Sequence, residues 1–298
     1  MIIVMRHRAS SEAVQRVIAE IRACGLQEHL SEGVERTIIG VVGDERRFED
    51  ARFAALPEVE RAVRILHDWQ IISREARAED TVITVRGVSF GGTEKVRLLA
   101  RPTQDFRQPE QAQAIFLDPY FTSSRPYEAL HAPSEKENAA AAKRAIAHWH
   151  EAGLPVMVRI RDTRHIEPTL AADADMLYLG GELPDNAALA REIGRLNTPL
   201  VLCKDKHHNS TDWLRAAERV ALHGNHHLIL GDAGTLNLDQ TITTRLDCEA
   251  IAIARTLSHL PILANLTALS NPYQNTAMLS AMAYAAGANA LIMRDETT

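Results

Sequence analysis

Cysteines are scarce in this chain, and long apolar runs are missing. Its three cysteines, Cys24, Cys203 and Cys248, lie far apart in the sequence. This spacing offers neither a disulfide framework nor a zinc site, so buried thiols are expected. No apolar run approaches the roughly 18 residues of a membrane-spanning helix. Arg6 and His7 also stand where the apolar core of a signal peptide would continue. We therefore expect a soluble, cytoplasmic protein with no membrane partner.

An excess of positive charge is missing as well. Lysine and arginine number 33 against 39 aspartate and glutamate residues, which gives a formal net charge of −6. Acids and bases are interspersed, so no basic stripe forms and nucleic acid is not an expected partner. The sequence also lacks a glycine-rich phosphate loop, an evident nucleophile–base pair and a closed set of metal ligands. With 46% apolar residues, the chain can bury a large core.

The first 70 residues predict a small α+β domain. Buried strands are expected at 2–5 and 37–42, helices at 11–24 and 45–56, and a last strand beginning at 63–66. One more strand after Cys24 would complete a ferredoxin-like domain. Residues 71–95 then form a charged linker and a hairpin-like segment, with strands at 81–85 and 88–90.

Residues 96–298 repeat a short aliphatic run, a polar turn and a longer amphipathic stretch, which indicates an α/β fold of the (β/α)8 TIM-barrel type. Six crossover helices are readable, at 134–152, 166–172, 186–196, 211–223, 248–257 and 276–286. Eight strands are expected at 96–100, 114–117, 156–160, 176–179, 200–202, 228–230, 262–264 and 290–293.

A full first and last outer helix are missing from this pattern. Only residues 108–112 could be helical between the first two strands, and the sequence ends four residues after Arg294. Both gaps flank the same side of a closed barrel, so an apolar strip should be left uncovered on the first and last strands. We expect a second copy of the chain, in a homo-oligomer, or the N-terminal domain to cover it.

Catalysis in such barrels takes place where the strands end. The ionisable and polar residues at these positions have two interpretations. In one, they form ion pairs that fill the rim. In the other, Arg159, Lys204 and Arg294 bind a small anionic ligand. The ligand-binding candidates are Arg159, Glu182, Lys204, Asp232, Asn265 and Arg294.

Successive segments resemble the class I, type beta DAHP synthases (phospho-2-dehydro-3-deoxyheptonate aldolases), the first enzymes of aromatic amino-acid biosynthesis in the shikimate pathway. The stretch EGVERTIIGVVGDE resembles the regulatory ferredoxin-like domain of that family. The stretches GLPVMVRIRDTRHIE, ADMLYLGGELPDN, LILGDAGT and AYAAGANALIMRDE resemble units of its barrel. The resemblance places His29 and Ser31 in the segment that takes part in feedback binding of an aromatic amino acid. The alternative is a turn stabilised by Ser31.

Family members condense phosphoenolpyruvate with erythrose 4-phosphate at a divalent metal held by Cys, His, Glu and Asp. The resemblance puts Thr103, Ala268 and Arg294 at the first three of these ligand positions, and the aspartate position lies beyond the matching segment. A phosphate-binding arginine falls on Glu182, and the family's Lys-Pro-Arg loop falls on residues 121–127 without its lysine and arginine. We therefore expect no metal ligands and no cofactor.

Three hypotheses follow from these changes. In the first, the protein is a catalytically silent homologue that senses a ligand or associates with an enzyme of the pathway. In the second, it is a metal-independent lyase or aldolase with Lys204 as the amine or Asp232 as the acid or base. In the third, it remains a DAHP synthase with an unconventional site.

Overall fold

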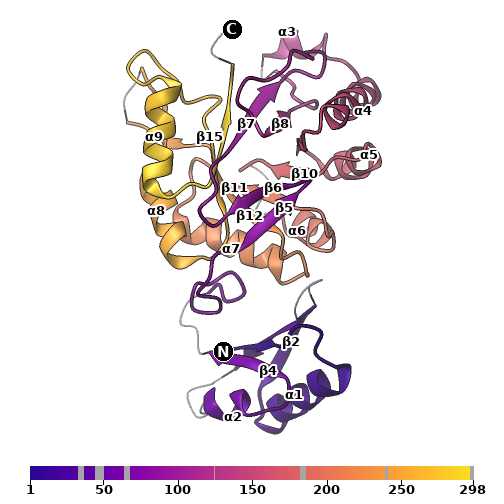
Figure 1. Cartoon of the computed structure of the whole chain (residues 1–298), viewed down its shortest axis with the longest axis vertical. Helices are drawn as coiled ribbons and strands as arrows, with labels where there is room; N and C mark the ends of the chain where they lie inside the picture. Colours follow the sequence, from indigo (N-terminus) through magenta and orange to yellow (C-terminus); the bar gives the residue numbers. More distant parts are fainter. Residues whose placement is uncertain are drawn as a thin grey trace.

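The computed structural model describes residues 1–32, 37–43, 50–63, 68–123, 125–181, 186–238 and 241–295. A four-stranded antiparallel sheet with two helices lies beneath a closed parallel barrel, at the end from which the barrel strands start (Figure 1). Within these ranges, none of the helices combines the length and the apolar character that crossing a bilayer requires.

The N-terminal sheet has the order β2-β3-β1-β4. Ile3 and Met5 pack with the helices on one face, whereas Ile2 and Val4 join the core that continues into the barrel, as the alternation of side chains along a strand requires. The strand expected after Cys24 is confirmed as β2. The elements are β1 (Ile2–Met5), α1 (Ser11–Ala23), β2 (Gln27–Glu32), β3 (Thr37–Val42), α2 (Asp50–Ala54) and β4 (Val59–Val63).

Two boundaries in this domain were predicted wrongly. The last strand begins at Val59, four residues before the expected start, and Val59 is opposite Met5 in the sheet. Glu60 and Arg61 obscured this strand, because an edge strand tolerates charged side chains. The second helix ends at Ala54, since the chain turns through Glu58, whose φ is 59°. The expected part of this helix at 45–49 lies outside the described residues.

The linker and hairpin connect the sheet to the barrel. The buried carboxylate of Glu218 accepts hydrogen bonds from the backbone N–H groups of Ile71 and Ile72, at 2.9 and 3.2 Å. The predicted hairpin forms as β5 (Val82–Val85) and β6 (Val88–Gly91). Phe90 from this hairpin joins the interior core of the barrel, so the hairpin closes the amino-terminal end of the strand cylinder.

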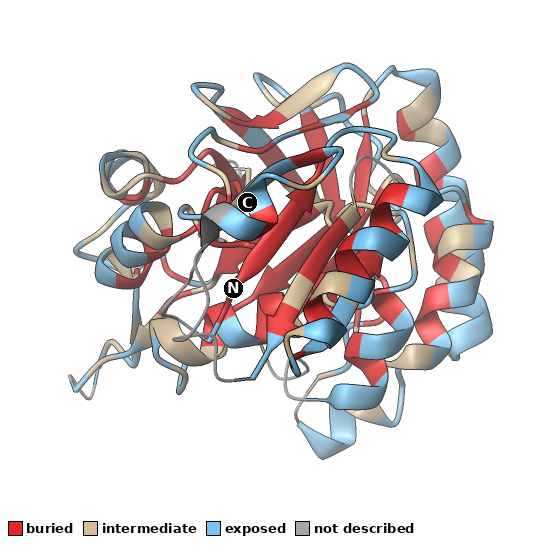
Figure 2. Ribbon diagram, turned by 90° about the horizontal axis from the view of Figure 1, so that it is seen from below, coloured by how far each residue is buried: buried red, intermediate tan, exposed pale blue. Residues whose placement is uncertain are grey.

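The predicted (β/α)8 barrel is confirmed. Its strands form a closed parallel ring in the order β10-β11-β12-β15-β16-β7-β8-β9. The strands are buried, and the surrounding helices are buried on the side that faces them (Figure 2). The strands are β7 (Val96–Arg101), β8 (Ala114–Leu117), β9 (Val156–Ile160), β10 (Met176–Leu179), β11 (Leu200–Cys203), β12 (Leu228–Asp232), β15 (Ile262–Asn265) and β16 (Ala290–Met293).

All six expected crossover helices are present, and several short elements were not expected. The crossover helices are α4 (Glu135–Glu151), α5 (Ile166–Ala171), α6 (Ala187–Ile193), α7 (Ser210–Ala221), α8 (Cys248–Leu257) and α9 (Thr276–Ala286). The unexpected elements are α3 (Pro126–Ala129), a 3-10 turn (Thr163–His165) and the strand pair β13 (Thr235–Leu236) and β14 (Thr244–Arg245). All of them lie in loops after strands, where sequence periodicity carries little signal.

The expected uncovered apolar strip on the first and last barrel strands is wrong. Residues 108–112 form an irregular loop rather than a helix, with Gln111 at a φ of 59°. This loop lies beside β7, where Gln111 and Gln113 accept hydrogen bonds from Arg97. Leu99 and Leu291 on the outer faces of β7 and β16 are 5% and 0% exposed. A homo-oligomer stays a prediction, but an uncovered apolar strip no longer supports it.

Candidate functional site

A cavity of about 360 Å³ opens at the carboxyl ends of the barrel strands. Arg159, Lys204 and Asn265 from the predicted set line it. Arg294 is exposed and is not among the residues that line it. Glu182 lies outside the described residues. The cavity is also lined by Tyr178, Gly180, Gly181, Cys203, Asp205, Lys206, His207, Ala233, Thr267 and Ala268.

Lys204 borders the mouth cavity, but its side chain and that of Asp232 do not point into the same rim as Arg159, which corrects the sequence interpretation. Along β11, Val201 and Cys203 belong to the interior core, whereas Leu200 and Leu202 pack in the outer layer against the helices. Because side chains alternate along a strand, Lys204 continues the outward set. Asp232 does the same on β12, after Leu228 and Leu230. Both side chains therefore lie between the strand ends and the start of α8.

Lys204 is enclosed by two carboxylates. Its Nζ lies 3.0 Å from Asp247 Oδ2 and 3.8 Å from Asp232 Oδ1, and the side chains of Lys204 and Asp232 have no exposed surface. Asp247 is also the N-cap of α8 and accepts the backbone N–H of Ala250. One cation thus neutralises two acids from different elements, and the fixed cap of a helix holds one of them.

The Asp232 carboxylate is poorly satisfied. Its Oδ2 accepts the backbone N–H of Gly234 at 3.0 Å, whereas Oδ1 is buried and accepts no hydrogen bond from the described part of the chain. Burial raises the pKa of Asp232 to about 6, and the charge of Lys204 offsets part of this rise. Desolvation therefore outweighs the ion pair at this carboxylate.

Side chains inside the mouth are fixed by mutual hydrogen bonds. Asn265 Nδ2 donates to the Tyr178 hydroxyl at 3.2 Å, and Asn265 Oδ1 accepts from the hydroxyl of Thr267 at 2.6 Å. The Arg159 guanidinium lies 5.6 Å from the centre of the Tyr178 ring. Burial raises the pKa of Tyr178 well above its ordinary value, so its hydroxyl stays protonated at neutral pH.

Arginines at the rim are paired with acids of this chain. Arg161 donates to Asp118 at 3.0 Å, and Arg159 lies 3.8 Å from the same carboxylate. On the other side of the barrel, the buried Arg101 contacts Asp295 at 2.9 Å and Asp105 at 3.4 Å. The guanidinium groups therefore already have anionic partners.

The model for the DAHP synthase ferredoxin-like domain matches residues 1–67. Phospho-2-dehydro-3-deoxyheptonate aldolase from Thermotoga maritima is 27% identical over 303 residues, covering 98% of this chain and 88% of that protein. This chain is therefore similar to a DAHP synthase along nearly its whole length, and its N-terminal domain matches the ferredoxin-like domain of these enzymes. The crystal structure of the T. maritima DAHP synthase is similar in fold, with a TM-score of 0.67 at 24% identity, covering 98% of this chain and 86% of that chain. A truncated form of the same synthase gives a TM-score of 0.65 at 21% identity, covering 76% of this chain and 86% of that chain.

The residues that the sequence resemblance assigns to the metal positions of the DAHP synthases would not suit a divalent cation. Thr103, Ala268 and Arg294 offer a hydroxyl, a methyl group and a cation in place of anionic or imidazole ligands. In the part of the chain that the structure describes, no group of three or more His, Cys, Asp and Glu side chains could hold a metal ion. Asp232 and Asp247 come close together, but the ammonium of Lys204 already neutralises both.

The two regulatory-domain candidates contact the barrel. His29 Nε2 donates to the backbone oxygen of Leu222 at 3.1 Å, and the Ser31 hydroxyl donates to that of Ala221 at 3.0 Å. Ser31 Oγ also lies 3.1 Å from His226 Nε2. The alternative of a turn stabilised by Ser31 is wrong, because Ser31 lies within β2. Both side chains instead dock the DAHP-synthase-type ferredoxin-like domain onto its barrel.

Sequence reasoning missed two residues of the candidate site. Asp247 could have been found, because an aspartate directly before the helix predicted at 248–257 is a typical N-cap. The inward orientation of Tyr178 could have been predicted as well, because this residue lies between the outward-facing Leu177 and Leu179 in a buried strand. Nothing in the sequence indicated that Lys204 would reach across to Asp247.

Proposed function

We propose that this DAHP-synthase-like protein does not catalyse the family condensation and acts as a non-catalytic homologue that senses a ligand or binds a partner. The observation that carries the proposal is that cations at the carboxyl ends of the barrel strands are already paired with acids of the chain itself. Lys204 is bound between Asp232 and Asp247, and Arg159 and Arg161 share Asp118. Cations held by the acids of the chain itself are poor receptors for the two phosphates of the family substrates.

Energetics support this interpretation. A charge-assisted hydrogen bond to a phosphate contributes about 1.5–3 kcal/mol, and the mapped positions have lost several such contacts. A divalent cation beside Arg294 would meet a like charge, which costs roughly 1–4 kcal/mol per unit of cation charge at contact distance in a solvated site. Substrate binding and metal binding are therefore both disfavoured at the positions that the family uses.

The direct test is condensation of phosphoenolpyruvate with erythrose 4-phosphate by the purified chain in the presence of Mn²⁺. We expect product formation no faster than in a blank without protein, while an active DAHP synthase assayed in parallel serves as the positive control. Metal analysis of the protein after removal of excess Mn²⁺ should find no stoichiometric ion. Turnover well above the blank, with one bound metal per chain, would contradict the proposal and favour an unconventional synthase site.

A metal-independent lyase or aldolase is the second candidate. The enclosure of Lys204 favours it, because an amine nucleophile needs a dry environment that stabilises its neutral form. Asp247 opposes it, because Lys204 Nζ is held in an ion pair with this carboxylate at 3.0 Å and is not presented to a substrate in the mouth cavity.

Reductive trapping distinguishes the two candidates. An imine between Lys204 and pyruvate would be reduced by borohydride to a stable secondary amine, and peptide mass spectrometry would locate it. We expect no adduct on Lys204 beyond the level of random labelling on exposed lysines such as Lys206. Stoichiometric labelling of Lys204 would instead establish the amine mechanism.

A further inference from the structure

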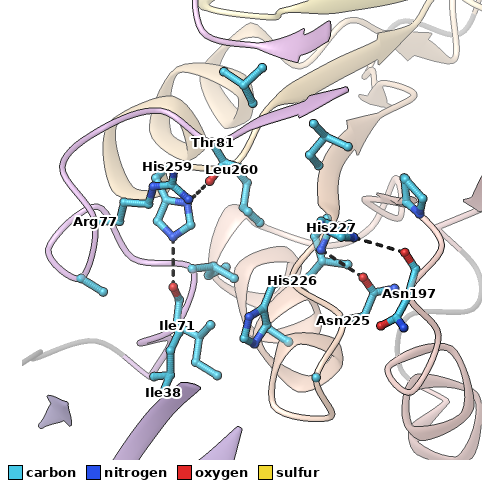
Figure 3. Close-up of a pocket in the computed structure, with 18 of the residues that line it drawn as sticks. Ile38, Ile71, Arg77, Thr81, Asn197, Asn225, His226, His227, His259 and Leu260 are labelled. Atoms are coloured by element: carbon cyan, nitrogen blue, oxygen red, sulfur yellow. Dashed lines mark hydrogen bonds between the residues drawn. The ribbon is translucent and has the colours of Figure 1, made fainter. Parts of the chain in front are cut away.

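A larger cavity, of about 510 Å³, lies at the opposite end of the barrel from the mouth. Three parts of the chain enclose it: the barrel-facing side of the ferredoxin-like sheet, the linker with the start of the hairpin, and the loops that precede β11, β12 and β15 (Figure 3). Val4 and Ile38 contribute from the sheet, Arg77 from the linker, and His227 and Leu260 from the barrel. Small-molecule sites occur preferentially at such interfaces between domains.

Aliphatic side chains form one part of the walls of this interdomain cavity, and threonine, asparagine and histidine side chains form much of the rest. Ile38, Ile71, Ile83 and Leu260 line it and are nearly inaccessible to water, whereas no Phe, Tyr or Trp is among its described lining residues. His259 belongs to the wall, because its Nδ1 accepts from the Thr81 hydroxyl and its Nε2 donates to the Ile71 backbone oxygen. The apolar surface suits a compact aliphatic group better than a flat ring that needs a stacking partner.

The charge of the cavity has one sign. Among its described lining residues there is no Asp or Glu, and Arg77 carries the one permanent charge. Glu60 and Glu79 share a smaller neighbouring crevice with Arg77, outside the interdomain cavity. A half-buried guanidinium beside an apolar cavity attracts a single negative charge, because a bidentate carboxylate matches its donors.

We propose that the interdomain cavity binds a branched or cyclic aliphatic monocarboxylate, with the carboxylate at Arg77 and the apolar group against Ile38, Ile71 and Leu260. A phosphate dianion would need more than one cation, and a cationic ligand would meet Arg77 with like charge. A ligand in this position contacts the ferredoxin-like domain, the linker and the barrel at once. Its binding therefore stabilises the docked arrangement of the two domains.

This site deepens the ligand-sensing part of the proposed function and does not depend on the loss of catalysis at the mouth. Cyclohexanecarboxylate is a suitable probe for titration calorimetry with the full chain, and cyclohexanecarboxamide is its neutral analogue. We expect saturable binding of the acid, with the amide weaker by about tenfold or more, because the amide cannot form a charge-assisted pair with Arg77.

Two variants and a control locate the site. Arg77→Gln should weaken binding of cyclohexanecarboxylate by about tenfold, and Ala76→Phe should abolish it by filling the cavity, with Tm reported for both. Arg144→Gln, at an exposed arginine on α4 far from the cavity, should bind the acid like the wild type. Amide hydrogen exchange should slow in β3 and in residues 71–77 when the acid is bound.

Three results would each overturn the assignment. They are equal affinity for the acid and the amide, unchanged binding of the acid after Arg77→Gln, and no saturable binding of the acid up to about 10 mM. A titration to this concentration detects even very weak sites. The condensation assay tests the proposed function separately. If the protein catalyses the condensation and also binds cyclohexanecarboxylate, only the proposed loss of catalysis is refuted. If it neither catalyses the condensation nor binds cyclohexanecarboxylate, only the cavity site is refuted.

Discussion

Lys204→Met should lower the free energy of unfolding by about 3–5 kcal/mol, the typical cost of removing one partner from a buried ion pair. The substitution keeps most of the side-chain volume but leaves Asp232 and Asp247 facing each other without a cation. Asp232 is fully enclosed, so water cannot take over the role of Lys204. For a chain of this size, the loss corresponds to a fall in Tm of about 5–8 °C.

Lys206→Met is the matched control for this experiment. Lys206 lies two residues further along and lines the same mouth cavity, but it is exposed. Its replacement should change stability by less than about 0.5 kcal/mol. Urea denaturation at pH 7 measures both variants. The double variant Lys204→Met, Asp232→Asn should recover part of the loss, since one of the two uncompensated charges is gone. Equal stability of the Lys204 and Lys206 variants would show that this ion cluster contributes nothing.

The barrel could be predicted from the sequence because its strands are buried on both faces. Such strands appear as short continuous aliphatic runs, as in Leu200–Cys203 and Ala290–Met293. Capping residues such as Asn209 before α7 mark where the crossover helices begin. The edge strand β4 was harder to place, because Glu60 and Arg61 interrupt its apolar pattern where one face meets solvent. Local pattern thus locates buried elements well and exposed ones poorly.

The candidate site was predicted less well, for a geometric reason. Lys204 and Asp232 were assigned to the mouth because they stand at strand ends. Side chains alternate between the two faces of a strand, however, and this alternation points both of them outward. The alternation itself was readable in the sequence. The partnership with Asp247 was not, because it depends on how α8 starts relative to β11 and β12. The interdomain cavity depends in the same way on docking contacts such as Ser31 with Ala221, which join residues 190 positions apart.

Asp232→Asn should make the protein relatively more stable as the pH rises, with a gain over the wild type of about 2.5 kcal/mol between pH 4 and pH 8. The folded-state pKa of Asp232 is raised from 3.8 to about 6. Between these values the folded chain binds a proton that the unfolded chain has released. The stability that this proton gives is fully present below pH 3.8 and is lost as the pH rises through 6. Asparagine keeps the neutral form at every pH.

The wild-type stability curve alone would hide this effect because of His259. Burial lowers the pKa of His259 from 6.5 to about 4, so the unfolded chain binds its proton first and stability falls as the pH drops from 6.5 to 4. The contributions of Asp232 and His259 thus have opposite slopes between pH 4 and pH 6, and similar size. The difference between Asp232→Asn and the wild type, measured by urea denaturation at each pH, isolates the carboxyl group. A difference that stays flat from pH 4 to pH 8 would mean that Lys204 keeps Asp232 ionised across this range, and that the enclosed cluster is a fully compensated ion pair.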